Sequence, residues 1–388
     1  MKDVSISKDV IYIGADDKEI NLFENQYVVP NGIAYNSYVI IDEKIAIMET
    51  IDKRKTDEWL NNLEKALKGR KPDYLIISHL EPDHAYNIDT VIKKYPDIKL
   101  VGNSKTFAFL PQFFDIEDLE KRKIEVKEDD ILELGKHKLH FIMAPMVHWP
   151  EVMMEYEETE KILFSADGFG KFGCLETDED WDCEARRYYF NIVGKYGIQV
   201  QAILKKASKL DIKTICPLHG PILKENLEHY IQKYDIWSKY ETESEGVYIA
   251  CASIHGNTLN VCEELKNILE EKGVKKVVLA DLSKEDWAEA IEDSFRYGKI
   301  VFASATYNMG IFTPMRNLLL NLKEKNYQNK KVAIIENGTW APNSGKCMKE
   351  IISTMKNVEI VEPIVTIKST LKQENIKQLN ELAENLLK

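Results

Sequence analysis

The feature that most limits the fold of this chain is a regular alternation of apolar and helical segments from Gly246 onward. Apolar runs typical of buried strands lie at Val247–Ala252, Lys276–Ala280, Lys299–Ser304, Lys331–Glu336 and Val358–Ile367. Helical patterns lie between or after them, at Thr258–Lys272, Glu285–Ser294, Pro314–Lys323 and Gln373–Leu387. Strands that alternate with helices in this way form a parallel sheet with helices on both faces, which predicts a doubly wound α/β domain.

The first part of the chain is richer in short strands. Strands are expected at Tyr38–Ile41, Lys44–Glu49, Tyr74–Ile77, Lys99–Gly102, Leu139–Met143, Val152–Tyr156 and Ile162–Ser165, the first two as a hairpin. Helical stretches lie between and after them, which predicts an αββα sandwich. The charged helical stretch Lys224–Glu245 is expected to end this domain, so the predicted domains are residues 1–245 and 246–388.

Composition excludes several classes of function. The formal net charge of −12 and the sequence pI of about 5.4 oppose binding to nucleic acid, because an acidic chain repels phosphate backbones. No apolar run approaches the roughly 18 residues of a membrane helix. The six cysteines form no C-x-x-C pair, which argues against a cysteine-ligated metal module and favours a reducing cytoplasm.

The strongest local signal is the run from His79 to His84, with the sequence HLEPDH. His79, Glu81, Asp83 and His84 place four potential metal ligands within six residues, in the loop directly after the expected strand Tyr74–Ile77. The pattern indicates a metal site. The alternative interpretation is a solvated loop in which the carboxylates cap neighbouring backbone groups.

Three further candidate ligands stand alone after expected strands. His148, Asp167 and His219 each lie in a strand-end loop beside glycine or proline. A structural role explains each of them alone better than metal binding does. Together with the HLEPDH run they supply a set of seven possible ligands. The remaining histidines, His137, His140 and His229, are expected to be packed or solvated.

The order of these residues resembles the metallo-β-lactamase superfamily, in which H-x-H-x-D-H is followed by His, Asp and His. Glu81 stands where that pattern has its second histidine. The added carboxylate makes the site harder and more anionic, which favours iron or manganese over zinc. This replacement is characteristic of the flavodiiron protein family, which the chain resembles over essentially its whole length.

The resemblance implies a role for each ligand. One iron would be held by His79, Glu81 and His148, and the other by Asp83, His84 and His219, with Asp167 as the bridge. The resemblance also places two aromatic residues, Trp149 and Tyr196, near the pocket, with Tyr196 as a hydrogen-bond donor to bound substrate. From sequence alone both aromatic side chains are better explained as core residues.

A second signal lies in the C-terminal domain. After its first strand, the loop Ala252–Thr258 carries small and hydroxyl residues that can surround a phosphate at a helix N-terminus, and it is similar to the phosphate loop of flavodoxins. Two later strand-end loops are expected to complete an FMN site. The candidate FMN contacts are Ser253, His255, Gly256, Asn257, Thr258, Thr306, Tyr307, Asn308, Gly310, Asn337, Gly338 and Trp340. A flavodoxin-like domain with an empty or different ligand site is the alternative.

The resemblance therefore implies a metallo-β-lactamase-like αββα sandwich followed by a flavodoxin-like doubly wound sheet. It implies reduction of dioxygen to water, of nitric oxide to nitrous oxide, or of both, at a di-iron centre supplied through FMN. The electron donor would be an external partner such as rubredoxin or reduced deazaflavin, and the chain would form a head-to-tail homodimer or a homotetramer. Two other hypotheses stay open: a zinc-dependent hydrolase, and an FMN electron-transfer protein with a structural metal site.

Overall fold

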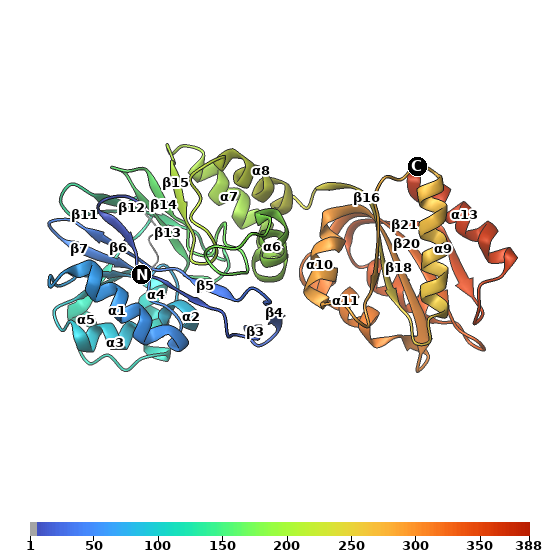
Figure 1. Cartoon of the computed structure of the whole chain (residues 1–388), viewed down its shortest axis with the longest axis horizontal. Coiled ribbons are helices and arrows are strands. Elements are labelled where there is room, and N and C mark those ends of the chain that lie inside the picture. Colours follow the sequence, from blue (N-terminus) through green and yellow to red (C-terminus); the bar gives the residue numbers. More distant parts are fainter. Residues whose placement is uncertain (1–5) are drawn as a thin grey trace. The chain divides into compact units, whose positions relative to one another are not determined.

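The computed structural model describes residues 6–388 of the chain, which divide into two compact units. The first unit comprises the chain up to Tyr189 and Ile198–Asp235, and the second comprises Phe190–Gly197 and Ile236–Lys388. Figure 1 shows the helices and strands of both units. The boundary between residues 245 and 246 stays a prediction.

One sheet of the first unit has the strand order β1-β6-β7-β8-β9-β10. Its strands are β1 (Val10–Tyr12), β6 (Tyr38–Ile41), β7 (Ile45–Met48), β8 (Tyr74–Ile76), β9 (Lys99–Gly102) and β10 (Lys123–Glu125). β6 and β7 form the expected antiparallel hairpin, and β7 continues into the parallel strands β8 and β9. Every residue of β7 is buried, as expected of an apolar strand covered on both faces.

The second sheet has the order β11-β12-β13-β14-β15. Its strands are β11 (Ile131–Glu133), β12 (Lys138–Met143), β13 (Met153–Glu157), β14 (Ile162–Phe164) and β15 (Thr214–Cys216). Side chains of both sheets meet in one core, where Ile40 and Met48 belong to the same buried cluster as Phe141 and Phe164. Two short pairs, β2 (Ala15–Asp17) with β5 (Ile33–Tyr35) and β3 (Leu22–Phe23) with β4 (Tyr27–Val28), extend from the sandwich.

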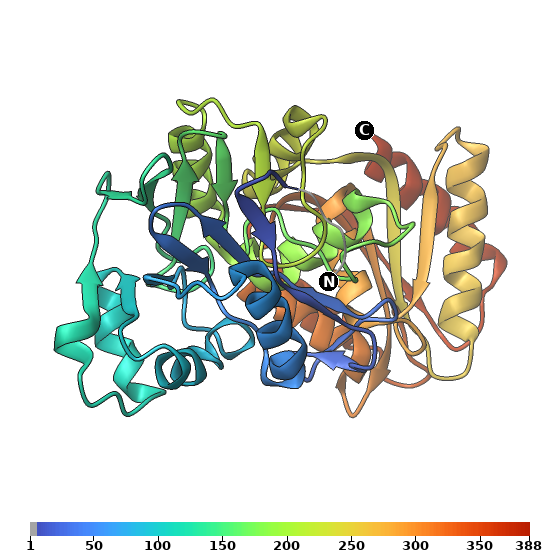
Figure 2. The same ribbon diagram turned by 60° about the vertical axis from the view of Figure 1, so that its left-hand side comes forward.

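Helices cover the outer faces of both sheets, which gives the predicted αββα layers. The helices of the first half are α1 (Thr56–Leu67), α2 (Pro82–Ala85), α3 (Ile88–Lys94), α4 (Ser104–Phe109) and α5 (Leu119–Arg122), with short turns η1 (Lys53–Lys55) and η2 (Leu110–Gln112). Those of the second half are α6 (Trp181–Tyr188), α7 (Gly197–Ala207) and α8 (Leu227–Ser238), whereas η3 (Tyr189–Val193) and η4 (Gly194–Tyr196) lie almost wholly in the segment Phe190–Gly197 of the second unit. The blue and cyan helices lie on one side and green α7 and α8 on the other (Figures 1 and 2).

The second unit is built on a parallel sheet with the order β17-β16-β18-β20-β21. Its strands are β16 (Ser244–Ala252), β17 (Val277–Asp281), β18 (Tyr297–Tyr307), β20 (Gln328–Asn337) and β21 (Lys356–Ile367), and the short β19 (Gly310–Ile311) pairs with β18. Numbered along the chain without β19, this is the order 2-1-3-4-5 of flavodoxin-like folds. The predicted doubly wound domain is confirmed.

Four of the five helices of this sheet were expected from the sequence. They are α9 (Asn257–Glu271), α10 (Trp287–Arg296), α11 (Thr313–Glu324), α12 (Ser344–Ile352) and α13 (Gln373–Leu387), of which α12 was not predicted. Helices α9 and α13 cover one face of the sheet, and α10 and α11 lie on the other (Figure 1). Buried Leu265 and Leu382, from α9 and α13, join Val301 and Ile335 of the sheet in one core.

The charged stretch Lys224–Glu245 is less helical than predicted. Helix α8 ends at Ser238, and strand β16 already begins at Ser244. Tyr240 takes a φ of 57°, a left-handed backbone conformation that cannot continue a right-handed helix. No helix in residues 6–388 is long and apolar enough to cross a membrane.

Candidate metal centre

The seven predicted ligands converge at one end of the αββα sandwich. Strand β8 leads into the loop that carries His79 and Glu81, and α2 follows at once with Asp83 and His84. The other three follow strands of the second sheet: His148 comes after β12, Asp167 after β14 and His219 after β15. Parallel strands end at the same edge of a sheet, which brings loops far apart in the sequence together.

Four of the side chains form a first group. The ligand atoms of His79, Glu81, His148 and Asp167 all lie within 4.8 Å of one another. Nε2 of His148 lies 2.9 Å from Glu81 Oε2 and 3.1 Å from Asp167 Oδ2. Nε2 of His79 also lies 3.1 Å from that same Asp167 oxygen. One carboxylate oxygen and two imidazole nitrogens therefore face a common point.

The other three side chains, Asp83, His84 and His219, form a second group with the same 4.8 Å limit. Nε2 of His219 lies 3.2 Å from Asp83 Oδ2 and 3.1 Å from Nε2 of His84. It also lies 3.7 Å from Asp167 Oδ1, the second oxygen of the carboxylate that faces the first group. Asp167 therefore spans both groups, one oxygen towards each.

Backbone groups fix the orientation of this cluster. His219 donates a hydrogen bond from Nδ1 to the carbonyl oxygen of Ala34 at 2.7 Å, which turns Nε2 towards Asp83. The buried carboxylate of Glu49 accepts from the backbone N–H of Ser78 and, at 3.1 Å, from that of His79. Glu151 accepts from the N–H of Leu80 at 2.9 Å. The loop is held in place independently of the side chains that it presents.

Burial and charge in the cluster fit a bound cation. Several buried polar atoms have no hydrogen-bond partner within residues 6–388, among them both carboxylate oxygens of Asp167 and Nε2 of both His79 and His148. Leaving one such atom unpaired costs about 1–3 kcal/mol, so a convergent set indicates a ligand. Burial lowers the pKa of His84 to about 3, which keeps its imidazole in the neutral form that binds a metal.

Aromatic side chains surround His219 and exclude water from that side. The rings of Phe23, Tyr35 and Tyr188 lie with their centroids 5.2, 5.9 and 5.6 Å from its imidazole. Burial, followed by the negative charges of Asp167 and neighbouring carboxylates, raises the pKa of Tyr188 well above its ordinary value. Its phenol therefore stays protonated and can act as a hydrogen-bond donor.

Sequence reasoning did not identify Tyr188. The tyrosine that it selected, Tyr196, lies in η4 of the second unit, and its role as a donor stays a prediction. Trp149 lies beside the first group, its ring 6.5 Å from that of His148. Tyr188 is the last residue of the buried helix α6, and no helix was predicted for this segment from the sequence.

In the second unit, the three predicted strand-end loops line one cavity of about 500 Å³. The cavity lies beyond the carboxyl ends of β16, β18 and β20, where the strand order reverses. Ten of the predicted contacts line it: Ser253, His255, Asn257, Thr258, Thr306, Tyr307, Asn308, Asn337, Gly338 and Trp340. Its volume is within the usual range for a cofactor site, and the Trp340 and Tyr307 side chains are largely exposed there.

Two predicted contacts, Gly256 and Gly310, do not line the cavity. Gly256 instead precedes α9 with a φ of 88°, a left-handed conformation that glycine adopts without strain. Ser369, after β21, lines the cavity and was missed. Its N–H donates to Asn337 Oδ1 at 3.1 Å, a contact between two loops that only the folded sheet brings together.

Comparisons with known proteins agree with this architecture. A family model described as "ODP family beta lactamase" matches residues 33–220. The nitric oxide reductase of Moorella thermoacetica is 27% identical over 99% of this chain and 98% of its own length. Diflavin flavoprotein A 1 of Synechocystis is 30% identical over 74% of this chain, which spans only 51% of that protein. The structure of rubredoxin oxygen:oxidoreductase from Desulfovibrio gigas matches with a TM-score of 0.90 at 25% identity, over 98% of this chain and 97% of that one.

Fold and site together define a class of protein in which a metallo-β-lactamase-like domain is joined to a flavodoxin-like domain. Two of the proteins that match both domains at once, from Moorella thermoacetica and Desulfovibrio gigas, are oxidoreductases by name. The chain is similar over nearly its whole length to proteins of the flavodiiron family and is an oxidoreductase, which confirms the resemblance drawn from Glu81 and the loops of the second domain.

Proposed function

We propose that this chain reduces dioxygen to water, nitric oxide to nitrous oxide, or both, with two irons in the candidate metal centre and FMN in the cavity of the second unit. The observation that carries the proposal is the position of Asp167. Its Oδ2 lies 3.1 Å from Nε2 of His79, and its Oδ1 lies 3.7 Å from Nε2 of His219. A carboxylate placed in this way would bridge two metal ions held by the two groups of side chains.

The donor set favours iron over zinc. Glu81, Asp83 and Asp167 supply three carboxylates beside four imidazoles, a mixture that suits redox-active iron better than the softer sites typical of zinc. When bound, two irons supply one-electron redox steps and open coordination positions for a diatomic gas. Zinc has no redox chemistry, so a zinc pair in the same residues would not support this activity.

The chain's own residues supply geometry, a dry environment and a proton. The bond from His219 to Ala34 fixes which ring nitrogen faces the centre. The ring of Phe23 covers the same imidazole and keeps water from it. The protonated phenol of Tyr188 is the donor that we assign to bound substrate, since its pKa responds to three carboxylates of the centre.

The cavity of the second unit suits FMN. A phosphate would lie at the N-terminus of α9, where free backbone N–H groups and the Asn257 side chain line the cavity. The exposed rings of Tyr307 and Trp340 offer faces for a flat heterocycle. FMN bound there would pass electrons from an external donor to the metal centre.

The proposed reaction consumes electrons and protons that an external partner has to supply. Four electrons and four protons convert one dioxygen to two waters, and two of each convert two nitric oxide molecules to nitrous oxide and water. The donor is proposed to be a separate protein such as rubredoxin, or reduced deazaflavin. The chain is proposed to act as a head-to-tail homodimer or a homotetramer, in which the FMN of one subunit serves the metal centre of the other.

The test is anaerobic turnover of each gas by protein whose iron and FMN contents have been measured, with reduced rubredoxin as donor. Fast loss of dioxygen with slow loss of nitric oxide would assign an oxygen reductase, and the reverse a nitric oxide reductase. The same protein with zinc in place of iron is the matched control and is expected to consume neither gas. In parallel, stopped-flow reoxidation of chemically reduced FMN by each gas removes the dependence on the donor. Iron-loaded protein whose flavin is reoxidised no faster than in the zinc form would contradict the proposal.

A further inference from the structure

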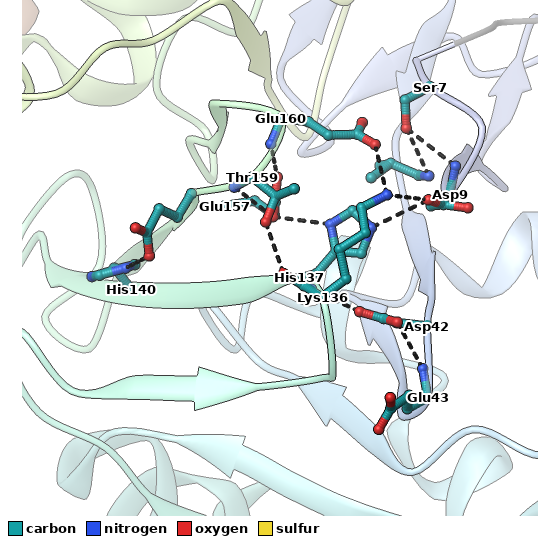
Figure 3. Close-up of polar contacts among 12 residues, drawn as sticks. Ser7, Asp9, Asp42, Glu43, Lys136, His137, His140, Glu157, Thr159 and Glu160 are labelled. Atoms are coloured by element: carbon teal, nitrogen blue, oxygen red, sulfur yellow. Dashed lines mark hydrogen bonds and ion pairs between the residues drawn. The ribbon is translucent and has the colours of Figure 1, made fainter.

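A third group of metal-ligand side chains lies outside the candidate metal centre. Turns and the segment before a strand supply its residues, whereas the ligands of the candidate centre follow the ends of strands. Asp9 precedes β1, His137 lies in the turn between β11 and β12, and Glu160 lies in the turn between β13 and β14. Their ligand atoms all lie within 4.8 Å of one another. Figure 3 shows the three side chains converging from segments of both sheets of the first unit.

The imidazole of His137 is fully buried, and its two nitrogens have different surroundings. Nδ1 lies 2.9 Å from Oε1 of the equally buried Glu157. Nε2 faces Oδ2 of Asp9 at 3.5 Å and has no hydrogen-bond partner within residues 6–388. A carboxylate hydrogen-bonded to one ring nitrogen, with no hydrogen bond at the other, is the arrangement that orients metal-binding histidines.

The spacing of the group suits a tetrahedral ion. Bonds of about 2.0–2.1 Å place adjacent ligand atoms about 3.3 Å apart, close to the separation of His137 Nε2 and Asp9 Oδ2. The side chains of Asp9 and Glu160 are 26% and 22% exposed, so an ion can enter from solvent and one position can hold water. The ammonium of Lys136 contacts Asp9 at 2.6 Å and lies 4.0 Å from Glu160, which shows that the group attracts a cation.

The backbone around these side chains is held by bonds of its own. The His137 N–H donates to Asp42 Oδ2 at 2.7 Å, and the hydroxyl of Thr159 donates to the carbonyl of Lys136 at 2.9 Å. Glu157 accepts from the backbone N–H of Glu160 at 2.7 Å. The donors are therefore preorganised, and only Lys136, whose side chain is 53% exposed, has to swing into solvent to admit an ion.

We propose that His137, Asp9 and Glu160 form a mononuclear zinc site, with Glu157 as the carboxylate that orients His137. An ion there would tie the segment before β1, in the first sheet, to turns of the second sheet. The proposal is independent of the dinuclear centre and of the reaction assigned to it. It changes the expectation for His137, which the sequence indicated to be a packed residue.

The test counts zinc in iron- and FMN-loaded protein after equilibrium dialysis against Zn²⁺, using only samples whose iron content is unchanged. We expect one zinc per chain in addition to the iron, located by anomalous diffraction at the zinc edge. His137→Gln should remove it, and Glu157→Gln should weaken it by about 10- to 100-fold. Lys136→Met should tighten it by about 10-fold, because the competing ammonium is gone.

The matched control is His140→Gln. His140 also pairs with a glutamate, its Nε2 lying 2.9 Å from Glu158 Oε2, but no third ligand joins this pair among the described residues. The His140→Gln variant should therefore still bind one zinc. Lys136→Met keeps the test decisive if His137→Gln fails to fold. Absence of zinc from both the wild type and Lys136→Met would overturn the proposal, as would equal zinc binding by His137→Gln and the wild type.

Discussion

Asp167 differs from the other candidate ligands because each of its carboxylate oxygens faces a different group of side chains. It is 1% exposed, and neither oxygen has a hydrogen-bond partner in residues 6–388. Burial acts to raise the pKa of Asp167, but the charges of His79 and His148 outweigh burial and hold this pKa well below its usual range. The carboxylate therefore stays ionised, which is the form that bridges metals.

Asp167→Asn tests the bridge with the least change in shape. The amide keeps one oxygen and loses the charge, so the two metal positions no longer share an anion. We expect the iron content to fall from two per chain to one or less, with loss of gas consumption, measured by iron analysis and electrode assay. Asp211→Asn removes an exposed carboxylate near β15 and serves as the control. Two irons and full turnover in Asp167→Asn would refute the bridge.

At the scale of elements, two helices of the first unit are joined by one carboxylate. Asp182, in the first turn of α6, lies 2.6 Å from Nε2 of His229 and 2.7 Å from Nζ of Lys233, one turn apart on α8. The same α6 ends at Tyr188, beside His219. The pair of contacts therefore fixes the helix that positions the proposed donor.

The contribution of the Asp182 contacts to the stability of the folded state should depend on pH. Burial acts to raise the pKa of Asp182, but the hydrogen bonds from Lys233 and His229 outweigh it and lower the pKa below 3.8. A carboxyl group whose pKa is lower in the folded state than in the unfolded state stabilises the folded protein at pH values above its unfolded-state pKa. That stabilisation is lost as the pH falls through the folded-state pKa. Asp182→Asn should cost about 1–2 kcal/mol at pH 7 in urea unfolding of the first unit.

The difference in the free energy of unfolding between the wild type and Asp182→Asn should persist down to about pH 4 and shrink below that pH. Asp211→Asn, whose partners Lys161 and Lys213 lie in solvent, should show no measurable change. A difference that grows as the pH falls would contradict this assignment, because the sign of the linkage would be reversed.

The N-terminus of α9 is the second element to which we assign a chemical role. Asn257 is its first residue and lines the cavity that we assign to FMN. Asn257→Asp adds a negative charge that should stabilise the helix by about 0.3–1 kcal/mol but repel a phosphate. We expect FMN to bind about 10-fold more weakly or worse, measured by fluorescence titration, while the flavin-free protein unfolds no earlier.

Asn260→Asp is the control for that experiment, since Asn260 is exposed on the next turn of α9 and does not line the cavity. It adds the same charge to the same helix and should leave FMN affinity unchanged. Equal affinity in wild type and Asn257→Asp would place the phosphate elsewhere.

How much the sequence predicts depends on how local the signal is. Strand β9 and helix α13 match their expected bounds, because each has a clear period and clear ends. The seven candidate ligands were found because each follows an apolar strand. Tyr188 and Ser369 were missed because their roles arise from contacts between distant segments. The pairing of His137 with Glu157 was missed for the same reason, since it depends on the register of β12 against β13.

At the scale of the whole molecule, the metal-ligand cluster belongs to one unit and the cavity that we assign to FMN to the other. In the proposed reaction electrons must cross from one to the other, within a chain or between chains. The proposed head-to-tail dimer makes the transfer intermolecular, with each FMN serving the partner's metal centre. Two variants that disable different units can therefore distinguish the two routes.

Asp167→Asn disables the metal centre, and Ser253→Asp combined with Asn257→Asp places two charges at the phosphate site and should disable FMN binding. Each variant alone is expected to be inactive. If transfer is between subunits, a mixed dimer retains one competent FMN–metal pair, because the intact FMN of one chain faces the intact centre of the other. Random mixing makes half the dimers mixed, so co-expression should restore about a quarter of wild-type gas consumption. Transfer within one chain leaves no competent pair, so a co-expressed sample as inactive as its parents would rule out the intermolecular route.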